Sequence, residues 1–335
     1  EITLTLIIGE GIGLIHKEDT IQGFFYGKGI DDFVDQYAVD GSEVSDILPA
    51  GNGETVMPKR EGKKSNKQIW ANYIHSKEKV DGIKLYGIDA DYTMQFNGAM
   101  VGADMWEGRN NLGGVAIMYA GGNTNGISGG VSTRNDMDYY GIGIYNRKDF
   151  RDNWSILYDL NYTHSKNDIR QHNRNQEITA KPKTNSFGVG VRAEKIFGDA
   201  KAQVTPFVGL RYNMINSGGY SNNLGIDYDT NRMNVFNMPI GVKFSCVTRN
   251  RGWSFSPYAE VAYIRNFGDT DNRTEMSYGG VSDSFGYDVL DKEAWSAKAG
   301  FAVARDNLSF NISYNHVKSS NSRNNRWHIG LNVSF

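Results

Sequence analysis

Residues Asn325–Phe335, NRWHIGLNVSF, alternate between apolar and polar side chains over the whole stretch. The apolar and aromatic members of the stretch share one parity: Trp327, Ile329, Leu331, Val333 and Phe335. Successive side chains of a β-strand point to opposite faces, so one face of this strand suits hydrocarbon and the other suits water. That is the pattern of a transmembrane β-strand. Such a strand has to hide both of its edges, which indicates a closed barrel.

The composition excludes several other classes of protein. Lys and Arg total 36 against 38 Asp and Glu, so the chain lacks the basic excess of a nucleic-acid-binding protein. The sequence has no run of ~18 apolar residues that could form a transmembrane helix. The mean hydropathy of -0.52 resembles that of a soluble protein, but a barrel hides its apolar residues in alternation. Cys246 stands alone, so no intramolecular disulfide is possible and a structural role is expected.

Twelve strand candidates follow one another from Gln68 to Phe335, separated by polar breaks. The sequence therefore predicts an all-β fold, a 12-stranded antiparallel transmembrane β-barrel. The candidates are about Gln68–Ser76, Tyr92–Trp106, Leu112–Gly121, Asp138–Asn146, Trp154–His164, Ser186–Lys195, Ala202–Asn213, Asn234–Cys246, Trp253–Arg265, Ala294–Ala304, Asn307–His316 and Arg326–Phe335.

Loop lengths distinguish this barrel from a soluble β-sandwich, whose strands also alternate. Connections after the even-numbered strands are short, as at Arg109 and at Arg305–Asp306. Connections after the odd-numbered strands are mostly long and polar, as at Asn167–Asn185 and Asn266–Glu293. Strict alternation of this kind is typical of a barrel with short periplasmic turns and longer extracellular loops.

The six tryptophans all lie near the ends of strand candidates, where interfacial aromatic residues are expected. Four fall beside the short turns and two beside the long loops: Trp70, Trp106, Trp154 and Trp253, then Trp295 and Trp327. The second strand fits less well, because Asp104 falls on its presumed lipid face. A bulge or an early end of the membrane zone would each explain that position.

The segment before Gln68 divides into two parts. Residues 1–48 are interpreted as a remnant of an exported stem, and residues 49–67 as a linker through the lumen of the barrel at 68–335. The linker carries a basic run, Lys59, Arg60, Lys63, Lys64 and Lys67. Pro49 and Pro58 interrupt helices, so the linker is expected to be largely non-helical or only partly helical.

Several stretches resemble a known family, the C-terminal translocator β-barrel of autotransporters, the type Va secretion proteins of diderm bacteria. They are Ile69–Gly82 (IWANYIHSKEKVDG), Phe96–Asp104 (FNGAMVGAD), Thr205–Tyr212 (TPFVGLRY), Met238–Ser245 (MPIGVKFS) and the aromatic last residue, in that order over twelve strands. Many members have a clear amphipathic helix just before the first strand, and this chain does not.

The resemblance implies a protein of the bacterial outer membrane that exports an N-terminal passenger to the cell surface. It also implies that periplasmic chaperones and the barrel-assembly machinery handle the chain, with the last strand as assembly signal. The partners expected are thus outer-membrane lipids, this machinery and the chain's own passenger segment, around a monomeric barrel without nucleic acid. A diffusion porin with an N-terminal extension is the alternative function.

Charged residues on the inward parity are expected to line the pore: Arg192, Glu194, Arg211, Lys243, Glu260 and Lys298. A charge on the lipid face near the middle of the bilayer would cost about 2–4 kcal/mol, which explains the sorting. Mutual ion pairs in a solvated lumen are one interpretation of these residues. The other is that Glu194 and Glu260 hold the basic linker.

No catalytic centre, cofactor or metal site is predicted. Acids and histidines near the outer rim could suit a surface hydrolase, but they form no ordered triad: Asp91, His164, Asp168, His172 and His316. Self-cleavage at Asn52 or Asn66, assisted by Asp159, Glu194 or Glu260, is not expected, because the chain has no paired-Asn helix. The histidines show no metal-ligand spacing with Cys or carboxylates.

Overall fold

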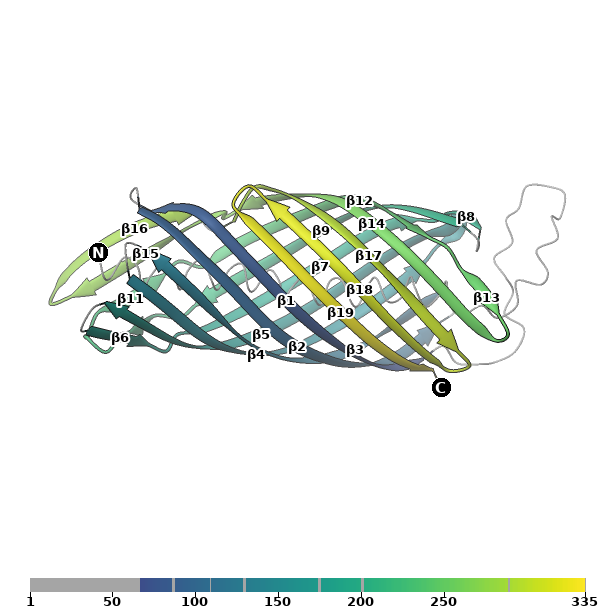
Figure 1. The fold of residues 1–335 in the computed structure, drawn as a ribbon, viewed down its shortest axis with the longest axis horizontal. Coiled ribbons are helices and arrows are strands. Elements are labelled where there is room, and N and C mark those ends of the chain that lie inside the picture. Colours follow the sequence, from purple (N-terminus) through teal and green to yellow (C-terminus); the bar gives the residue numbers. More distant parts are fainter. Residues whose placement is uncertain are drawn as a thin grey trace.

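The computed structural model describes residues 67–334, apart from 86–87, 109, 129–130, 174–175, 200–201 and 289. Residues 1–48, all of the predicted linker except Lys67, and Phe335 therefore lie outside the described part. Twelve long antiparallel strands form a closed ring, in which each strand pairs with the next and the last pairs with the first (Figure 1). No described helix is long and apolar enough to cross a membrane.

The predicted twelve strands are all present, and most are longer than expected. Around the ring they are β1 (Gln68–Leu85), β2 (Ile88–Gly108), β3 (Asn111–Ser128), β4 (Val131–Asp149), β5 (Trp154–Asn173), β7 (Lys183–Lys195), β9 (Ala202–Ser217), β12 (Met233–Ser245), β14 (Trp253–Gly268), β17 (Glu293–Arg305), β18 (Leu308–Ser319) and β19 (Ser322–Ser334).

The last strand closes the ring against the first. Pairing runs from Gln68 opposite Ser334 to Val80 opposite Ser322, so β1 and β19 satisfy each other's backbone edges. An unpaired backbone edge in hydrocarbon is costly, which is why a spanning sheet has to close. The first and last strands therefore begin and end at the same end of the barrel.

That end carries the predicted short turns. β2 and β3 are separated by residues 109–110, and β17 and β18 by Asp306 and Asn307. The other three short connections contain only small elements. They are the 3-10 turn η1 (Arg151–Asn153), β8 (Phe197–Asp199) and β13 (Thr248–Asn250). Asp306 has φ of 53°, a left-handed conformation that Asp tolerates better than most residues.

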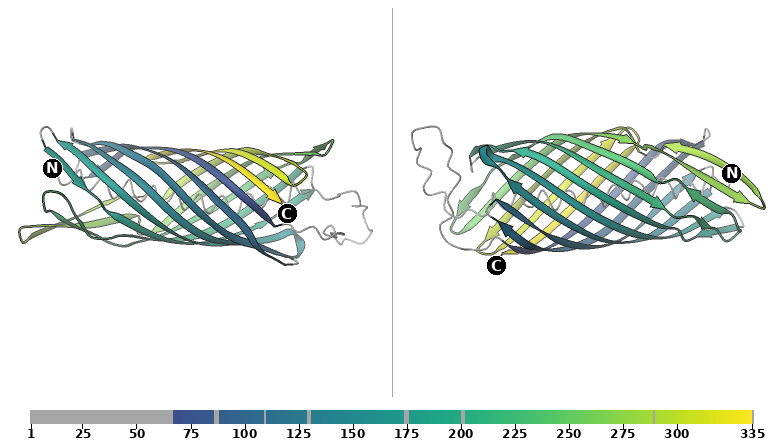
Figure 2. Two further views of the ribbon diagram at one scale, coloured as in Figure 1. Left: turned by 90° about the horizontal axis from the view of Figure 1, so that it is seen from below. Right: turned by 180° about the vertical axis from the view of Figure 1, so that it is seen from behind.

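At the opposite end of the barrel, the sequence predicted long polar loops. Most residues of those segments instead form strands. β1 and β2 continue until residues 86–87, and β3 and β4 until residues 129–130. Beyond β5, β6 (Gln176–Ala180) turns back along it. A separate four-stranded sheet contains β10 (Tyr220–Ser221), β11 (Asp227–Thr230), β15 (Asp271–Tyr278) and β16 (Val281–Asp288). Figure 2 shows these elements projecting beyond the barrel.

The outer surface of the barrel is apolar, as the alternation predicted. In the last strand Trp327, Ile329, Leu331 and Val333 are 38–49% exposed, while Asn332 between them is buried. The same sorting holds in β5, where Tyr158 and Leu160 are exposed and Asp159 and Asn161 are buried. Large apolar side chains with no protein neighbour on this scale require a hydrocarbon environment.

The second strand is oriented opposite to the expectation. The face of β2 that carries Met94, Phe96 and Met100 is buried in the lumen, and Asp104 lies on the same face. A register irregularity does occur between Asp104 and Trp106, but it does not explain Asp104, which points inward anyway. Trp70 also lies inside the barrel, with 7% of its side chain exposed. The other five tryptophans have exposed side chains.

Candidate functional site

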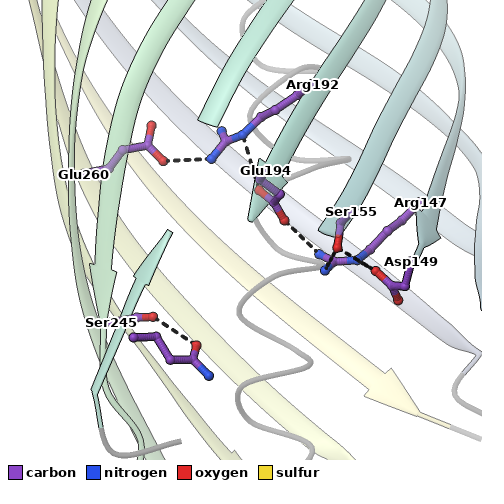
Figure 3. Close-up of polar contacts among 8 residues, drawn as sticks. Arg147, Asp149, Ser155, Arg192, Glu194, Ser245 and Glu260 are labelled. Carbon is purple, nitrogen blue, oxygen red and sulfur yellow. Dashed lines mark hydrogen bonds and ion pairs between the residues drawn. The ribbon is translucent and has the colours of Figure 1, made fainter. Parts of the chain in front are cut away.

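The lumen has a charged wall, centred on β4, β5 and β7. Arg147 donates from Nε to Asp149 Oδ1 at 2.7 Å, from Nη2 to Ser155 Oγ at 2.7 Å and from Nη1 to Glu194 Oε1 at 3.2 Å. Ser155 donates to the same Asp149 oxygen at 2.7 Å (Figure 3). One guanidinium thus serves two carboxylates, a geometry that Arg supports and Lys does not.

The charged wall continues through Arg192 to β14. Nε of Arg192 lies 3.4 Å from Glu194 Oε2, and Nη2 donates to Glu260 Oε2 at 3.3 Å. The guanidinium also stacks 3.7 Å from the centroid of the Phe207 ring. In Figure 3 the dashed contacts form one chain from Glu260 to Asp149. The chain joins β14, β7, β4 and β5, so it ties four strands together from within.

A second ion pair connects β9 with β5. Arg211 Nη2 donates to both oxygens of Asp159 at 2.6 Å, and the two side chains are 5% and 4% exposed. Gly190 on β7 lies between them, and a Cβ there would be 2.5 Å from Asp159 Oδ2 and 2.7 Å from Arg211 Nη2. The absence of a side chain at Gly190 is therefore what lets the pair cross the intervening strand.

Two lysines flank Glu260 on the neighbouring strands. Lys243 of β12 and Lys298 of β17 both stand opposite Glu260 in the strand register. Their ammonium groups lie 4.8 and 5.5 Å from the centroid of the Tyr258 ring. The aromatic face supplies a cation–π contact to each cation.

The lumen lining beside the charged wall is apolar. This apolar wall lies on β1–β4, and none of its members is more than 7% exposed: Trp70, Ile74, Phe96, Met100, Leu112, Ala116, Met118, Ala120, Met137, Tyr139 and Tyr145. The lumen thus differs from a purely hydrated channel, whose lining would be polar all round.

A hydrogen-bonded chain fastens the start of β1 at the short-turn end. Trp70 Nε1 donates to Tyr145 Oη at 2.8 Å, and Tyr145 donates to Asp104 Oδ1 at 2.7 Å. The other oxygen, Asp104 Oδ2, accepts from the backbone nitrogen of Gln68 at 2.9 Å. Lys67 Nζ donates to the carbonyl of Met105 at 3.0 Å. The point at which the chain enters the first strand is therefore held inside the wall.

The six residues expected to line the pore lie on β7, β9, β12, β14 and β17, on the parity opposite to the exposed apolar side chains of those strands. Arg192, Glu194, Arg211 and Lys243 are at most 4% exposed, and the side chain of Glu260 is 12% exposed. The structure adds Arg147, Asp149 and Asp159 as their partners. Asp159 lies on the polar parity of the predicted strand Trp154–His164, whereas Arg147 and Asp149 lie at the end of β4 beyond the predicted strand Asp138–Asn146. Extending that alternation by three residues would have found them.

The rim residues considered for hydrolysis are not brought together. His164, Asp168 and His172 are on β5, and His316 is on β18, six strands away by either path round the ring. Asp168 is paired with Arg170 at 3.2 Å, which with the nearby Lys181 holds the pKa of that carboxyl below its usual value. Within the described ranges, no group of three or more His, Cys, Asp or Glu could hold a metal ion.

Comparison with known proteins places this architecture in a family. Residues 69–315 match the model of the autotransporter beta-domain. The putative uncharacterized protein YaiT of Escherichia coli strain K12 is 28% identical over 232 residues, which are 66% of this chain and 22% of YaiT. The chain therefore spans about a fifth of the length of this relative.

Three solved structures share the fold. The transport unit of the autotransporter AIDA-I from Escherichia coli has a TM-score of 0.64 at 16% identity, covering 84% of this chain and 94% of its own. The beta domain of the Bordetella autotransporter BrkA has 0.63 at 12%, covering 81% and 100%. The translocator domain of NalP from Neisseria meningitidis has 0.59 at 15%, covering 83% and 90%.

The family match covers well over half of the chain, and the ring of twelve strands agrees with it. The barrel is an outer-membrane translocator barrel of the autotransporter type. The chain belongs to the autotransporter beta-domain family.

Proposed function

We propose that the lumen of this barrel carries one polypeptide segment, residues 49–67, which connects the barrel to a passenger of which residues 1–48 are the remaining stem. The observation that carries the proposal is the position of Gln68. It pairs with Ser334 at the short-turn end, where Asp104 binds its backbone nitrogen from inside the wall. A passenger continuous with Gln68 has to cross the lumen once to reach the surface.

The length of the segment suits this path. The hydrocarbon core is about 25–30 Å thick, and an extended chain covers ~3.3 Å per residue, so roughly ten residues suffice. Residues 49–67 provide enough, and Pro49 and Pro58 favour the extended form over a continuous helix. A passage of this kind needs a single barrel, which supports a monomeric translocator.

The two walls support contacts of different kinds with the segment. The apolar wall offers surface to its hydrophobic side chains, and the charged wall offers Glu194 and Glu260 to the basic run Lys59–Lys67. Because Arg147 and Arg192 already bind these carboxylates, the attraction left for the linker is moderate. A moderate attraction retains a segment in the lumen without preventing its passage during export.

Ion conductance in planar bilayers tests the role of these carboxylates. The unmodified chain is expected to be plugged, and a chain lacking residues 49–66 provides the open reference. The double change E194K and E260K should raise the conductance toward that reference, whereas the surface change E293K should not. A double variant that stays fully plugged would count against Glu194 and Glu260 as linker contacts.

The barrel works without catalysis in this proposal. Asp159 and Glu194 are engaged by Arg211 and Arg147, so they act as wall ion pairs and not as acids for peptide cleavage. The changes D159N and E194Q should therefore leave the amount of any released passenger unchanged on immunoblots of culture medium. Loss of release in either variant would indicate assisted cleavage instead.

The path of the segment is tested by protease shaving. A tag placed after Gly29 should be cleaved on intact cells, because residues 1–48 lie outside the cell in this proposal. A tag that is cleaved only after the outer membrane is permeabilised would put the segment in the periplasm. That result would favour the alternative function, a diffusion porin.

The last strand is proposed as the assembly signal for the barrel-assembly machinery, after delivery by periplasmic chaperones. Until β1 arrives, β19 carries the exposed edge that later pairs from Ser322 to Ser334. An exposed strand edge is a natural template for a partner that binds by strand addition.

A further inference from the structure

A three-residue pattern occurs on three strands of the outer surface, and translocation does not account for it. Tyr, His and Lys follow one another at every second position, so all three side chains of each set share one face. We refer to each set as a ladder. The ladders are Tyr73, His75 and Lys77 on β1; Tyr162, His164 and Lys166 on β5; and Tyr314, His316 and Lys318 on β18.

Each ladder is held by an asparagine of a neighbouring strand. Tyr73 donates to Asn97 Oδ1 at 2.7 Å, and His75 Nδ1 lies 2.9 Å from the same oxygen. Asn185 and Asn325 repeat both contacts on the other two ladders, at 2.7–2.8 Å. With Nδ1 donating to the amide oxygen, Nε2 of each imidazole is left to face outward.

The ladders begin at the level of the interfacial aromatic residues. Trp327 stands between Tyr314 and His75 in the register, and its ring centroid lies 4.9 Å from that of Tyr314. Tyr and Trp mark the boundary between hydrocarbon and headgroups. From there each ladder runs away from the short turns. Its lysine lies two residues beyond its histidine, which is about 6–7 Å along the strand. This places the lysine in the headgroup region of the outer leaflet.

The ladders on β1 and β18 belong to one basic patch, formed by Lys77, Lys79, Lys318 and Arg323. Lys318, Arg323 and Lys79 occupy one row across β18, β19 and β1. Adjacent strands are ~4.8 Å apart, so these like charges repel one another unless an anion lies between or above them.

The protein neutralises only part of the basic patch. Asp81 pairs with Lys79 at 2.8 Å and with Arg323 at 3.1 Å. Lys77 and Lys318 are exposed, and neither forms an ion pair in the described part of the chain. Hydrogen bonding from Lys79 keeps the pKa of Asp81 below its usual value, and Asp81 pairs with only two of the four cations.

The β5 ladder has a different surrounding, although its sequence pattern is the same. Lys166 stands opposite Asp138 in the register with β4 and opposite Lys183 in the register with β7. Asp136 and Asp168 lie in the next row. Arg134 pairs with Asp136, and Arg170 and Lys181 pair with Asp168. Three carboxylates thus lie among five cations there, whereas the four cations of the basic patch have one paired carboxylate, Asp81.

We propose that the basic patch on β18, β19 and β1 binds the phosphate groups of a phosphorylated glycolipid in the outer leaflet. The location of the patch favours a lipid as the ligand. The patch lies directly beyond the lipid-facing Trp327 and Ile329, at the level where lipid headgroups are the nearest anions. The phosphate would receive charge-assisted hydrogen bonds from Lys77 and Lys318 and relieve the repulsion along the row. The site would also hold the seam between the first and last strands.

Lipid binding to the purified, refolded chain in detergent micelles tests this site by native mass spectrometry. The lipids are bis-phosphorylated lipid A and zwitterionic phosphatidylethanolamine, and the variant is K77Q with K318Q. A basic residue near a charged membrane surface contributes about 1 kcal/mol, so losing two should weaken lipid A binding about thirty-fold at ~1.4 kcal/mol per tenfold. Phosphatidylethanolamine binding should not change.

The matched control is K166Q with K183Q, which removes two exposed lysines from β5 and β7. This control should change lipid A binding less than about threefold, since Asp136, Asp138 and Asp168 lie beside these lysines. Heat-modifiable gel mobility verifies that each variant is folded. Equal loss in both double variants, or wild-type binding that does not distinguish the two lipids, would overturn the proposal. So would an acidic peptide that binds the patch where lipid A does not.

Discussion

Glu194 offers the sharpest test of the charged wall. Its side chain is 0% exposed and lies between two guanidinium groups, at 3.2 Å from Arg147 and 3.4 Å from Arg192. The change E194Q keeps the shape of the side chain and removes its charge. Both arginines then remain buried beside a neutral amide, which tests the ion pairs without creating a cavity.

The expected loss follows from the geometry. At an effective dielectric constant of about 20, each contact is worth roughly 5 kcal/mol of attraction, much of it offset by the desolvation of the carboxylate. Removing one partner of a buried pair costs about 3–5 kcal/mol. Arg147 keeps Asp149 and Arg192 keeps Glu260, so we expect the lower end, about 3 kcal/mol of unfolding free energy.

Equilibrium unfolding in urea, followed by tryptophan fluorescence of the barrel in micelles, measures this loss. The control is E293Q, which removes the carboxylate of the exposed pair Arg265–Glu293, with side chains 42% and 57% exposed. An exposed pair is worth about 0–1 kcal/mol, so the control should be nearly neutral. A loss for E194Q no larger than that for E293Q would refute a stabilising role of the charged wall.

Three further predictions concern packing, assembly and orientation. A Cβ at Gly102 would lie 2.2 Å from the Trp70 ring, so G102A should displace the indole, break its bond to Tyr145 and cost about 1–3 kcal/mol in the same assay. G218A, where a Cβ meets nothing within 4 Å, should be neutral, and equal effects would refute the prediction. Changing Trp327 and Phe335 to Ser should sharply lower the amount of barrel in outer-membrane fractions. Removing Trp295 and Phe301 from the outer face of β17 should lower it less, and normal levels of the first variant would contradict the role of the last strand. A tag inserted between Gly279 and Gly280, in the exposed β15–β16 turn, should bind antibody on intact cells. A tag after Gly252 should bind only after permeabilisation, and the reverse result would invert the proposed orientation.

The number of strands, their order and the outward face of most of them could be predicted because these features are local. Alternation with period two marks a strand wherever one face meets hydrocarbon and the other meets water. This was sufficient for β5 and β19, where every second residue is apolar, and for placing Arg192, Glu194 and Lys243 inside. The short turns between β2 and β3 and between β17 and β18 were also evident, since a tight turn leaves few residues between two alternating runs.

Features that depend on several strands at once were decided only by the tertiary structure. In β2, apolar Met94, Phe96 and Met100 face the lumen, because a second apolar environment exists inside the ring, and hydrophobicity alone does not distinguish packed protein from lipid. The polar segments at the far end fold as paired strands, since ladder hydrogen bonds depend on a partner and not on composition. Arg192 on β7 and Glu260 on β14 are 68 residues apart, and their contact exists only because the sheet curves across β9 and β12, which lie between them. Sequence periodicity thus determined which side chains of most strands face the lumen. The closed ring determined which other side chains they contact there.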